Sequence, residues 1–219
     1  MYIGNIKFSG EIEKKDLVDK NLEILKKKTF WCAVSTHKGE ENICLNTHIN
    51  LKKTYNDLIT IIVPRHIKRC IEISNLCKKY NLSSQILDDK ELINNEKEII
   101  IINSFGTLSK FYNYSKSVFI GKSMIKKLEK VSGQNPIEAA KLRCKIYHGP
   151  YVYNFKEIYD LLKSYKISEE VNDEKELYKK LTRDLKNSED HEDKTADIIN
   201  DMGQKILDKT TREINKLLI

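Results

Sequence analysis

The sequence predicts an α/β fold with a doubly wound, mostly parallel sheet. Short apolar runs alternate with longer helical segments about six times along the chain, as in repeated strand–helix units. Several of these runs are apolar throughout, which is typical of parallel strands buried on both faces. Polar residues follow most of the runs directly, and a parallel sheet places its ligand site at those strand ends.

Each expected strand is a short apolar or β-branched run: 30–35, 58–64, 84–87, 98–103, 117–121, 145–148 and 166–171. The helical patterns between them cover 16–28, 40–55, 66–80, 107–115, 136–142, 155–164, 174–186 and 195–218. We expect the last helix to bury one apolar face, formed by Ile198, Met202, Ile206, Ile214 and Leu217.

Composition fits one domain with extensions at its ends. The chain has 219 residues, of which 40% are hydrophobic. We divide it into an extended lead-in at 1–10, the α/β domain at 11–187 and a C-terminal helical segment at 188–219. The acidic stretch 188–193 breaks the pattern between the last two parts.

The net charge of +7 suggests an anionic partner such as a nucleotide, a phospholipid surface or a nucleic acid. A solvated lysine-rich surface is the alternative, because 32 acidic residues are interleaved with 39 basic ones. An RNA-binding signature is absent, so we expect no nucleic-acid partner. The longest apolar runs fall short of the roughly 20 residues that a membrane span requires.

The cysteines show no metal or disulfide spacing. Five of them occur singly and without a C-x-x-C pair: Cys32, Cys44, Cys70, Cys77 and Cys144. This pattern favours reduced thiols in a cytosol. Since no tight His or Cys spacing occurs either, we expect no metal and no cofactor. Dinucleotide-binding, P-loop and serine-hydrolase glycine motifs are also missing.

The stretch 121–138 combines a strand end, a loop of small residues and a helix start. Asn135 is the candidate N-cap, and Pro136 suits the first helical position. Unpaired N–H groups and the helix dipole make such a corner suitable for an anion. Glu138 would lie in the first turn, facing either the backbone or a ligand hydroxyl. An ordinary capping box is the alternative.

Polar clusters follow five of the expected strands, and their convergence predicts a shared crevice. The clusters are Ser35, Thr36, His37, Glu40 and Glu41; Arg65 and His66; Ser104, Phe105 and Gly106; Gly121, Lys122 and Ser123; and residues 148–154. Arg65 suits a phosphate through its planar fork, or is an ordinary surface arginine. His37 and His66 are hydrogen-bonding or titrating groups, or purely structural ones.

These motifs, in this order, resemble the donor-binding half of the 3-deoxy-D-manno-octulosonic acid (Kdo) transferases, which are two-domain B-type glycosyltransferases. The resemblance covers about 4–185. It rests on the stretches 4–8, 35–41, 64–66, 121–123, 134–138 and 149–155. It implies a Rossmann-like nucleotide-sugar-binding domain whose donor is CMP-Kdo.

The resemblance also implies which residues bind the donor. The expected set is Ser35, Thr36, His37, Glu40, Arg65, His66, Gly106, Gly121, Lys122, Ser123, Gln134, Asn135 and Glu138. Within it, Arg65, Ser123 and the helix start at Asn135 would meet the phosphate. Glu138 would contact the ribose, and Gly106 would allow the backbone to approach the nucleotide.

Two positions depart from the family pattern. Lys122 stands where a glycine is usual, and Gln134 stands where a histidine is usual. In this family the catalytic acidic residue, the acceptor surface and the membrane anchor belong to the first domain. We therefore expect a chain that binds donor but is inactive alone, peripheral to the cytoplasmic face of a bacterial inner membrane. There the whole enzyme would glycosylate a lipid A precursor of lipopolysaccharide. A domain using another nucleotide sugar and a non-catalytic nucleotide-binding module remain alternatives.

Overall fold

The computed structural model describes residues 8–10, 17, 19–186 and 194–217. Its centre is a seven-stranded sheet in the order β3-β4-β2-β1-β5-β6-β7, and every recorded strand pairing is parallel. The strands are β1 Phe30–Thr36, β2 Ile59–Pro64, β3 Ser84–Leu87, β4 Ile99–Ile102, β5 Ser117–Ile120, β6 Lys145–His148 and β7 Ser168–Glu170.

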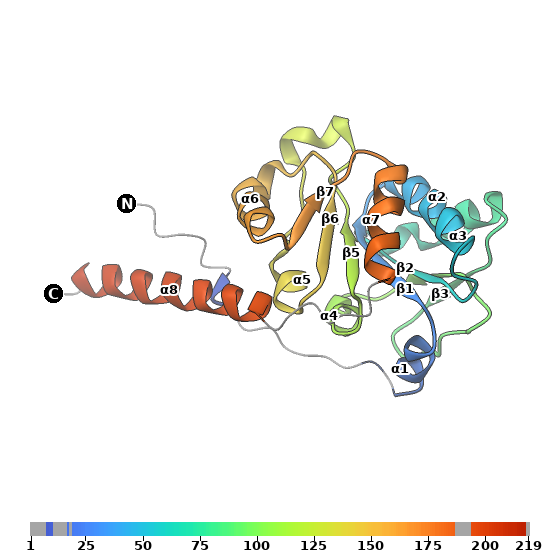
Figure 1. Ribbon diagram of the computed structural model, residues 1–219, viewed down its shortest axis with the longest axis horizontal. Coiled ribbons are helices and arrows are strands. Elements are labelled where there is room, and N and C mark those ends of the chain that lie inside the picture. Colours follow the sequence, from blue (N-terminus) through green and yellow to red (C-terminus); the bar gives the residue numbers. More distant parts are fainter. Residues whose placement is uncertain (1–7, 11–16, 18, 187–193, 218–219) are drawn as a thin grey trace.

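Helices cover both faces of the sheet (Figure 1). One layer holds α2 Glu40–Lys52, α3 Cys70–Lys79 and α7 Glu174–Lys186. The other holds α1 Asp19–Lys26, α4 Leu108–Tyr112, α5 Ile137–Lys141, α6 Lys156–Ser164 and α8 Lys194–Leu217. Three short 3₁₀ turns complete the elements: η2 Ile67–Arg69, η3 Lys126–Val131 and η4 Tyr153–Phe155. The predicted doubly wound, Rossmann-like fold is confirmed.

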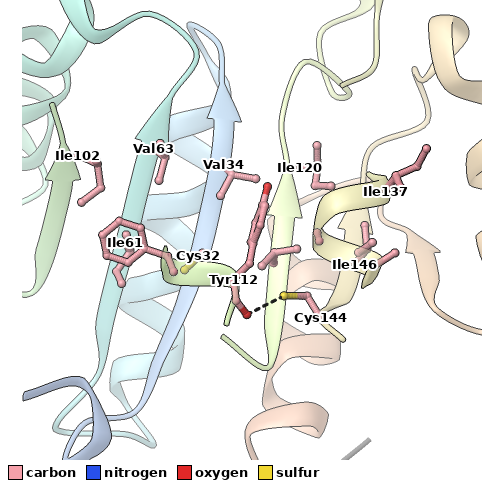
Figure 2. Packing of buried hydrophobic residues seen from close by; sticks show 14 of the residues in the cluster. Cys32, Val34, Ile61, Val63, Ile102, Tyr112, Ile120, Ile137, Cys144 and Ile146 are labelled. Carbon is pink, nitrogen blue, oxygen red and sulfur yellow. Dashed lines mark hydrogen bonds between the residues drawn. The ribbon is translucent and has the colours of Figure 1, made fainter. Parts of the chain in front are cut away.

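The strands form because their residues favour a sheet buried on both faces. All four residues of β4 are isoleucines, and all are buried. Branching at Cβ restricts χ1 and suits the pleated backbone. Alternate side chains of β1 enter different cores: Cys32 and Val34 face α4 and α5, whereas Trp31 and Ala33 face α2. Figure 2 shows the first of these cores around Tyr112.

A further contact links α4 to the strand β6 side of the core. The Cys144 thiol donates to the backbone oxygen of Tyr112 at 3.3 Å (Figure 2). Burial raises the pKa of Cys144, so the thiol stays protonated. All five cysteines are free and buried, and the reduced thiols act as small apolar side chains here.

Several expected boundaries shift inward. α4 and α5 each contain five residues, shorter than the predicted 107–115 and 136–142. β7 begins at Ser168, because Lys166 adopts φ 59° in the turn before it. The lead-in at 1–7 and the acidic stretch at 188–193 lie outside the described residues. The domain boundaries at 10 and 187 therefore stay predictions.

The helix α8 buries part of the expected face, since Ile198, Met202 and Ile206 are partly buried, and it also buries residues that were not expected. Ile199 is fully buried, and Gly203 lies so close to Phe8 that an added Cβ would come 2.2 Å from its backbone oxygen. Ile206 packs beside them, whereas the expected contact residue Ile214 is 51% exposed. The side chain of Leu217 lies outside the described part. The helix packs against α5 and then extends away from the sheet (Figure 1).

Candidate functional site

The strand order reverses between β1 and β5, which pair side by side although α2 leads away to β2. Connections leaving two such strands diverge, and ligands bind in the crevice that opens between them. The segments at this point are 35–39, which comprises the end of β1 and the loop after it, and 121–125 after β5. The segment 64–66 comprises the end of β2 and the loop after it, on the neighbouring side. Most of the predicted site residues come from these three segments.

Glu40, at the first position of α2, holds two of the loops together. Its buried carboxylate accepts four backbone N–H bonds. Oε2 accepts from His37 at 2.9 Å and Lys122 at 2.8 Å, and Oε1 accepts from Ser123 at 2.8 Å and Met124 at 3.0 Å. Charge-assisted bonds of this kind are the stronger ones in proteins. Both oxygens are occupied by the main chain, so Glu40 shapes the crevice through these loops.

Gly121 is required by the same packing. A Cβ there would come 2.7 Å from both Glu40 Oε2 and the Cα of Thr36, and such contacts do not occur. Thr36 itself is fully buried, and its Oγ1 has no hydrogen-bond partner among the described residues. The glycine therefore allows β5 to end directly against β1, with no room for a side chain between them.

Ser123 joins the β5 loop to the end of β6. Its hydroxyl donates to the backbone oxygen of Ile120 at 2.7 Å and accepts the N–H of Gly149 at 2.8 Å. The residue is completely buried. Because its only proton is already used, the geometry favours a loop-positioning role over the predicted phosphate contact.

Two loop residues adopt left-handed backbone angles that favour glycine. Ser35 has φ 53°, at a bulge between β1 and β2, and Lys122 has φ 57°. A residue with a Cβ is strained by roughly 1–2 kcal/mol in this region. A glycine at position 122 would adopt this conformation without strain, so the lysine brings its positive charge to this loop at the cost of backbone strain.

Two histidines meet across the first two loops. The rings of His37 and His66 contact edge to face, with centroids 5.7 Å apart. His37 Nδ1 lies 3.1 Å from the backbone oxygen of Ser35. Partial burial lowers the pKa of His37, against the raising effects of Ser35 and Glu40, while the positive charge of Lys122 lowers it further. His37 is therefore neutral at pH 7.

Arg65 is the cation best placed to receive an external anion. Its backbone N–H donates to Thr36 at 3.1 Å, which fixes the loop against β1. The side chain is exposed, and within the described part of the chain its guanidinium forms no ion pair. His66 is exposed beside it. Arg65, His66, His37 and Lys122 thus form a continuous basic and hydrogen-bonding edge.

An ion pair that the sequence did not single out anchors the Arg65 loop. Glu41 is fully buried and receives Arg69 in a two-pronged contact, Nη1 to Oε1 at 2.6 Å and Nη2 to Oε2 at 3.1 Å. This pair ties η2 to the start of α2. The two neighbouring acids thus hold different loops. Glu40 holds the loop after β5, and Glu41 holds the loop after β2. Only the adjacency of the two acids after β1 hinted at this arrangement.

The second half of the predicted site follows η3. The helix α5 begins one residue later than expected: it starts at Ile137, and Pro136 is at the N-cap position. Asn135 precedes the cap, and its Oδ1 accepts the N–H of Ile137 at 3.1 Å. The helix that follows contains five residues, and Pro136 supplies no N–H. A macrodipole is correspondingly small, so any anion binding here would depend on individual backbone groups. Glu138 is half buried on this helix, and the backbone oxygen of Gln134 accepts the Tyr159 hydroxyl at 3.0 Å.

Gly106 lies apart from these loops. It follows β4, which is separated from β1 by β2, and it has φ 69° with open space around it. Phe105 beside it is 74% exposed. Gly106 and Phe105 lie at the same edge of the sheet as the crevice, but β2 separates their strand, β4, from β1.

Neither a cluster of metal ligands nor a membrane-spanning helix is found among the described residues. No group of three or more His, Cys, Asp or Glu side chains in the described ranges could hold a metal ion. Within the same ranges, no helix has the length and hydrophobicity needed to cross a membrane.

The fold defines the class: a Rossmann-like α/β domain, in which the point where the strand order reverses is the candidate ligand site. The sequence is more specific, and the chain is a homologue of the Kdo transferases. It is 27% identical to the 3-deoxy-D-manno-octulosonic acid transferase of Haemophilus influenzae over 220 residues, covering 98% of this chain and 49% of that protein. The corresponding enzyme of Rickettsia bellii is 30% identical over 225 residues, covering 98% and 51%.

The chain therefore spans about half the length of the curated Kdo transferases that it matches. It is also 32% identical over 186 residues to a bifunctional glycosyltransferase/methyltransferase of Fusobacterium nucleatum, covering 81% of this chain and 27% of that protein. No protein-family model matches.

Among solved structures, the fold resembles the C-terminal CMP-Kdo binding domain of WaaA from Acinetobacter baumannii. The TM-score is 0.68 at 21% identity, and the match covers 86% of this chain and 96% of that one. This likeness supports the fold. The resemblance noticed in the sequence is confirmed, whereas the individual roles of the site residues stay predictions.

Proposed function

We propose that this chain is the donor-binding domain of a Kdo transferase and that CMP-Kdo binds in the crevice between β1 and β5. Homology over nearly the whole chain supports the family, and the crevice supports the kind of ligand. CMP-Kdo carries a phosphate and a sugar carboxylate, which are two anionic groups. A site for it needs cations that are not neutralised by the protein.

The observation that carries the proposal is the basic edge formed by Arg65, His66, His37 and Lys122. The exposed Arg65 guanidinium presents a planar fork suited to phosphate or carboxylate. Lys122 adds a second positive charge on the loop after β5. Glu40 and Glu41, whose negative charges would repel the donor, are directed into backbone N–H groups and into Arg69. The crevice therefore presents positive charge to the ligand.

We further propose that the whole enzyme transfers Kdo to a lipid A precursor at the cytoplasmic face of a bacterial inner membrane, without a metal. The base that deprotonates the acceptor hydroxyl would come from the first domain of the transferase. In this scheme Arg65, Lys122 and nearby N–H groups stabilise the phosphate charge that develops as the donor bond breaks. On its own the donor domain would bind CMP-Kdo without turning it over.

Isothermal titration of this chain with CMP, and with UMP as control, tests the proposal. We expect CMP to bind more tightly than UMP and the Arg65→Ala variant to lose most of this binding. Arg212→Ala, at an exposed position on α8, is the matched control and should bind like the wild type. Equal binding of CMP, UMP and GDP would instead favour another nucleotide sugar. Absence of binding to any nucleotide would contradict the proposal.

A further inference from the structure

A second hollow lies beside the crevice, between α6 and the segment 150–153. Its volume is about 300 Å³, at the lower end of the range for small-molecule sites. His148 from the end of β6 lines it, together with Tyr151, Tyr153 and Tyr159. None of the predicted donor-binding residues lines this hollow. The proposed function therefore leaves it without a role.

His148 contributes a buried polar atom that lacks a partner. The residue is 3% exposed, and its Nδ1 lies 2.7 Å from the backbone oxygen of Gly149. Burial lowers the pKa of His148, so the ring is neutral at pH 7. Nδ1 then carries the proton and donates it to Gly149, which leaves Nε2 as an acceptor. Nε2 is buried and has no partner among the described residues.

An unpaired buried acceptor of this kind costs about 1–3 kcal/mol. Because Nε2 has almost no accessible surface, a ligand O–H group recovers that free energy only when the wall of the hollow shifts to admit it. The orientation of the His148 ring is also fixed by packing. Tyr159 packs against it with centroids 4.3 Å apart, and the Tyr159 hydroxyl is anchored on Gln134.

The remaining wall suits a ring with many hydroxyl groups. Tyr153 is 67% exposed and offers an aromatic face at the rim. Charges of both signs surround the hollow, and Lys156 is already paired with Asp160 at 2.7 Å. Glu129 and Glu170 outnumber the remaining lysine, Lys163. The hollow therefore lacks the excess positive charge that a phosphate group requires, whereas hydroxyl groups can bond to either sign.

We propose that this hollow binds a saccharide ring, one hydroxyl of which donates to His148 Nε2 while the ring packs on Tyr153. The site goes beyond the proposed donor crevice and does not depend on it. Its occupant is a neutral saccharide separate from the donor, because Glu129 and Glu170 would repel the carboxylate of Kdo. The hollow and the loop after β5 are joined by a backbone hydrogen bond, in which the N–H of Tyr151 donates to the backbone oxygen of Ser123 at 2.9 Å.

NMR of the histidine ring nitrogens in the whole chain tests this directly. We expect the His148 Nε2 resonance to move when N-acetylglucosamine or glucose is added in the millimolar range, and not when free Kdo is added. His48 is an internal control, because its Nε2 is also buried without a partner yet lines no hollow that the structure shows. A response to the neutral sugars supports the proposal, and a response to free Kdo alone would overturn it.

Two variants keep the test independent of folding. His148→Phe keeps a ring but removes the acceptor, so sugar affinity should fall about tenfold, as for the loss of one hydrogen bond to a buried group. Tyr153→Ala should weaken binding without loss of stability, while Tyr165→Ala, at an exposed tyrosine outside the hollow, should not. The proposal is overturned if no sugar moves the His148 resonance, if inorganic phosphate moves it equally, or if Tyr153→Ala binds like the wild type. Failure of CMP to bind would leave this result unaffected.

Discussion

Glu40 Oε2 accepts the backbone N–H of Lys122 at 2.8 Å, across 82 residues of sequence. One carboxylate thereby holds the ends of β1 and β5 in register with each other. The crevice exists in its present shape because a helix N-terminus after one strand supplies the acceptor for the loop after the other. The consequences of this arrangement can be measured.

Replacing Glu40 by glutamine should disrupt the loop after β5. The amide keeps one oxygen but turns an NH₂ group toward N–H groups that need an acceptor. Hydrogen bonds to charged groups are worth about 1.5–3 kcal/mol each in net stability, so we expect a loss of roughly 2–3 kcal/mol. Urea unfolding measures it, with Glu23→Gln at an exposed position on α1 as control. CMP affinity should fall in the same variant. Unchanged stability would show that the four N–H bonds contribute little.

Removing one partner of the Glu41–Arg69 pair should lower the free energy of unfolding more than removing both charges. Arg69→Met leaves a buried carboxylate without its partner, and such losses are about 3–5 kcal/mol. The double variant Glu41→Gln with Arg69→Met removes both charges and should recover a large part of this loss. Chemical unfolding of the two single variants and the double variant gives the coupling free energy. A double variant as unstable as the sum of the singles would contradict a direct interaction.

Two substitutions at Lys122 distinguish the effect of backbone strain on stability from the effect of the lysine charge on binding. Lys122→Gly should stabilise the fold by about 0.5–1 kcal/mol, because glycine adopts φ 57° without the Cβ penalty. Lys122→Ala removes the same charge and keeps the strain, so it should not stabilise. Both variants should bind CMP more weakly than the wild type if the ammonium group faces the donor. Thermal unfolding and titration calorimetry together decide between the two effects.

His48 should make the protein less stable in mild acid. Burial lowers its pKa from 6.5 to about 4, and its Nδ1 lies 2.8 Å from Thr60 Oγ1 in the core. Because the folded pKa lies below the unfolded one, the stabilising contribution is complete above pH 6.5 and is lost as the pH falls toward 4. The loss is at most about 3 kcal/mol.

The free energy of unfolding, measured at intervals from pH 7.5 to pH 4 (about the window of the shift), should therefore fall more steeply for the wild type than for His48→Gln. The difference between the two profiles isolates this residue from His37 and His148, whose pKa values are also lowered. Parallel profiles would show that His48 is not the titrating group.

Local patterns in the sequence determined the elements and the kind of edge at which the site lies. The expected strand 145–148 and the expected helix 174–186 agree with β6 and α7, because apolar runs and helical periodicity depend on neighbouring residues. The proposed site residues Arg65, His37 and Lys122 could be singled out for a similar reason, because each lies within two residues of a strand end. The family resemblance was also carried by short local motifs.

Contacts between distant segments decided the rest. The place of β4 between β3 and β2, the burial of Ile199 on α8 and the pair of Glu41 with Arg69 each depend on packing that no local pattern encodes. Glu40 and Ser123 were expected to face a ligand, yet their polar atoms are used by the main chain. A sequence shows which groups can form hydrogen bonds. Only the tertiary structure, by excluding water and bringing donors and acceptors together, decides which of those groups remain free for a ligand.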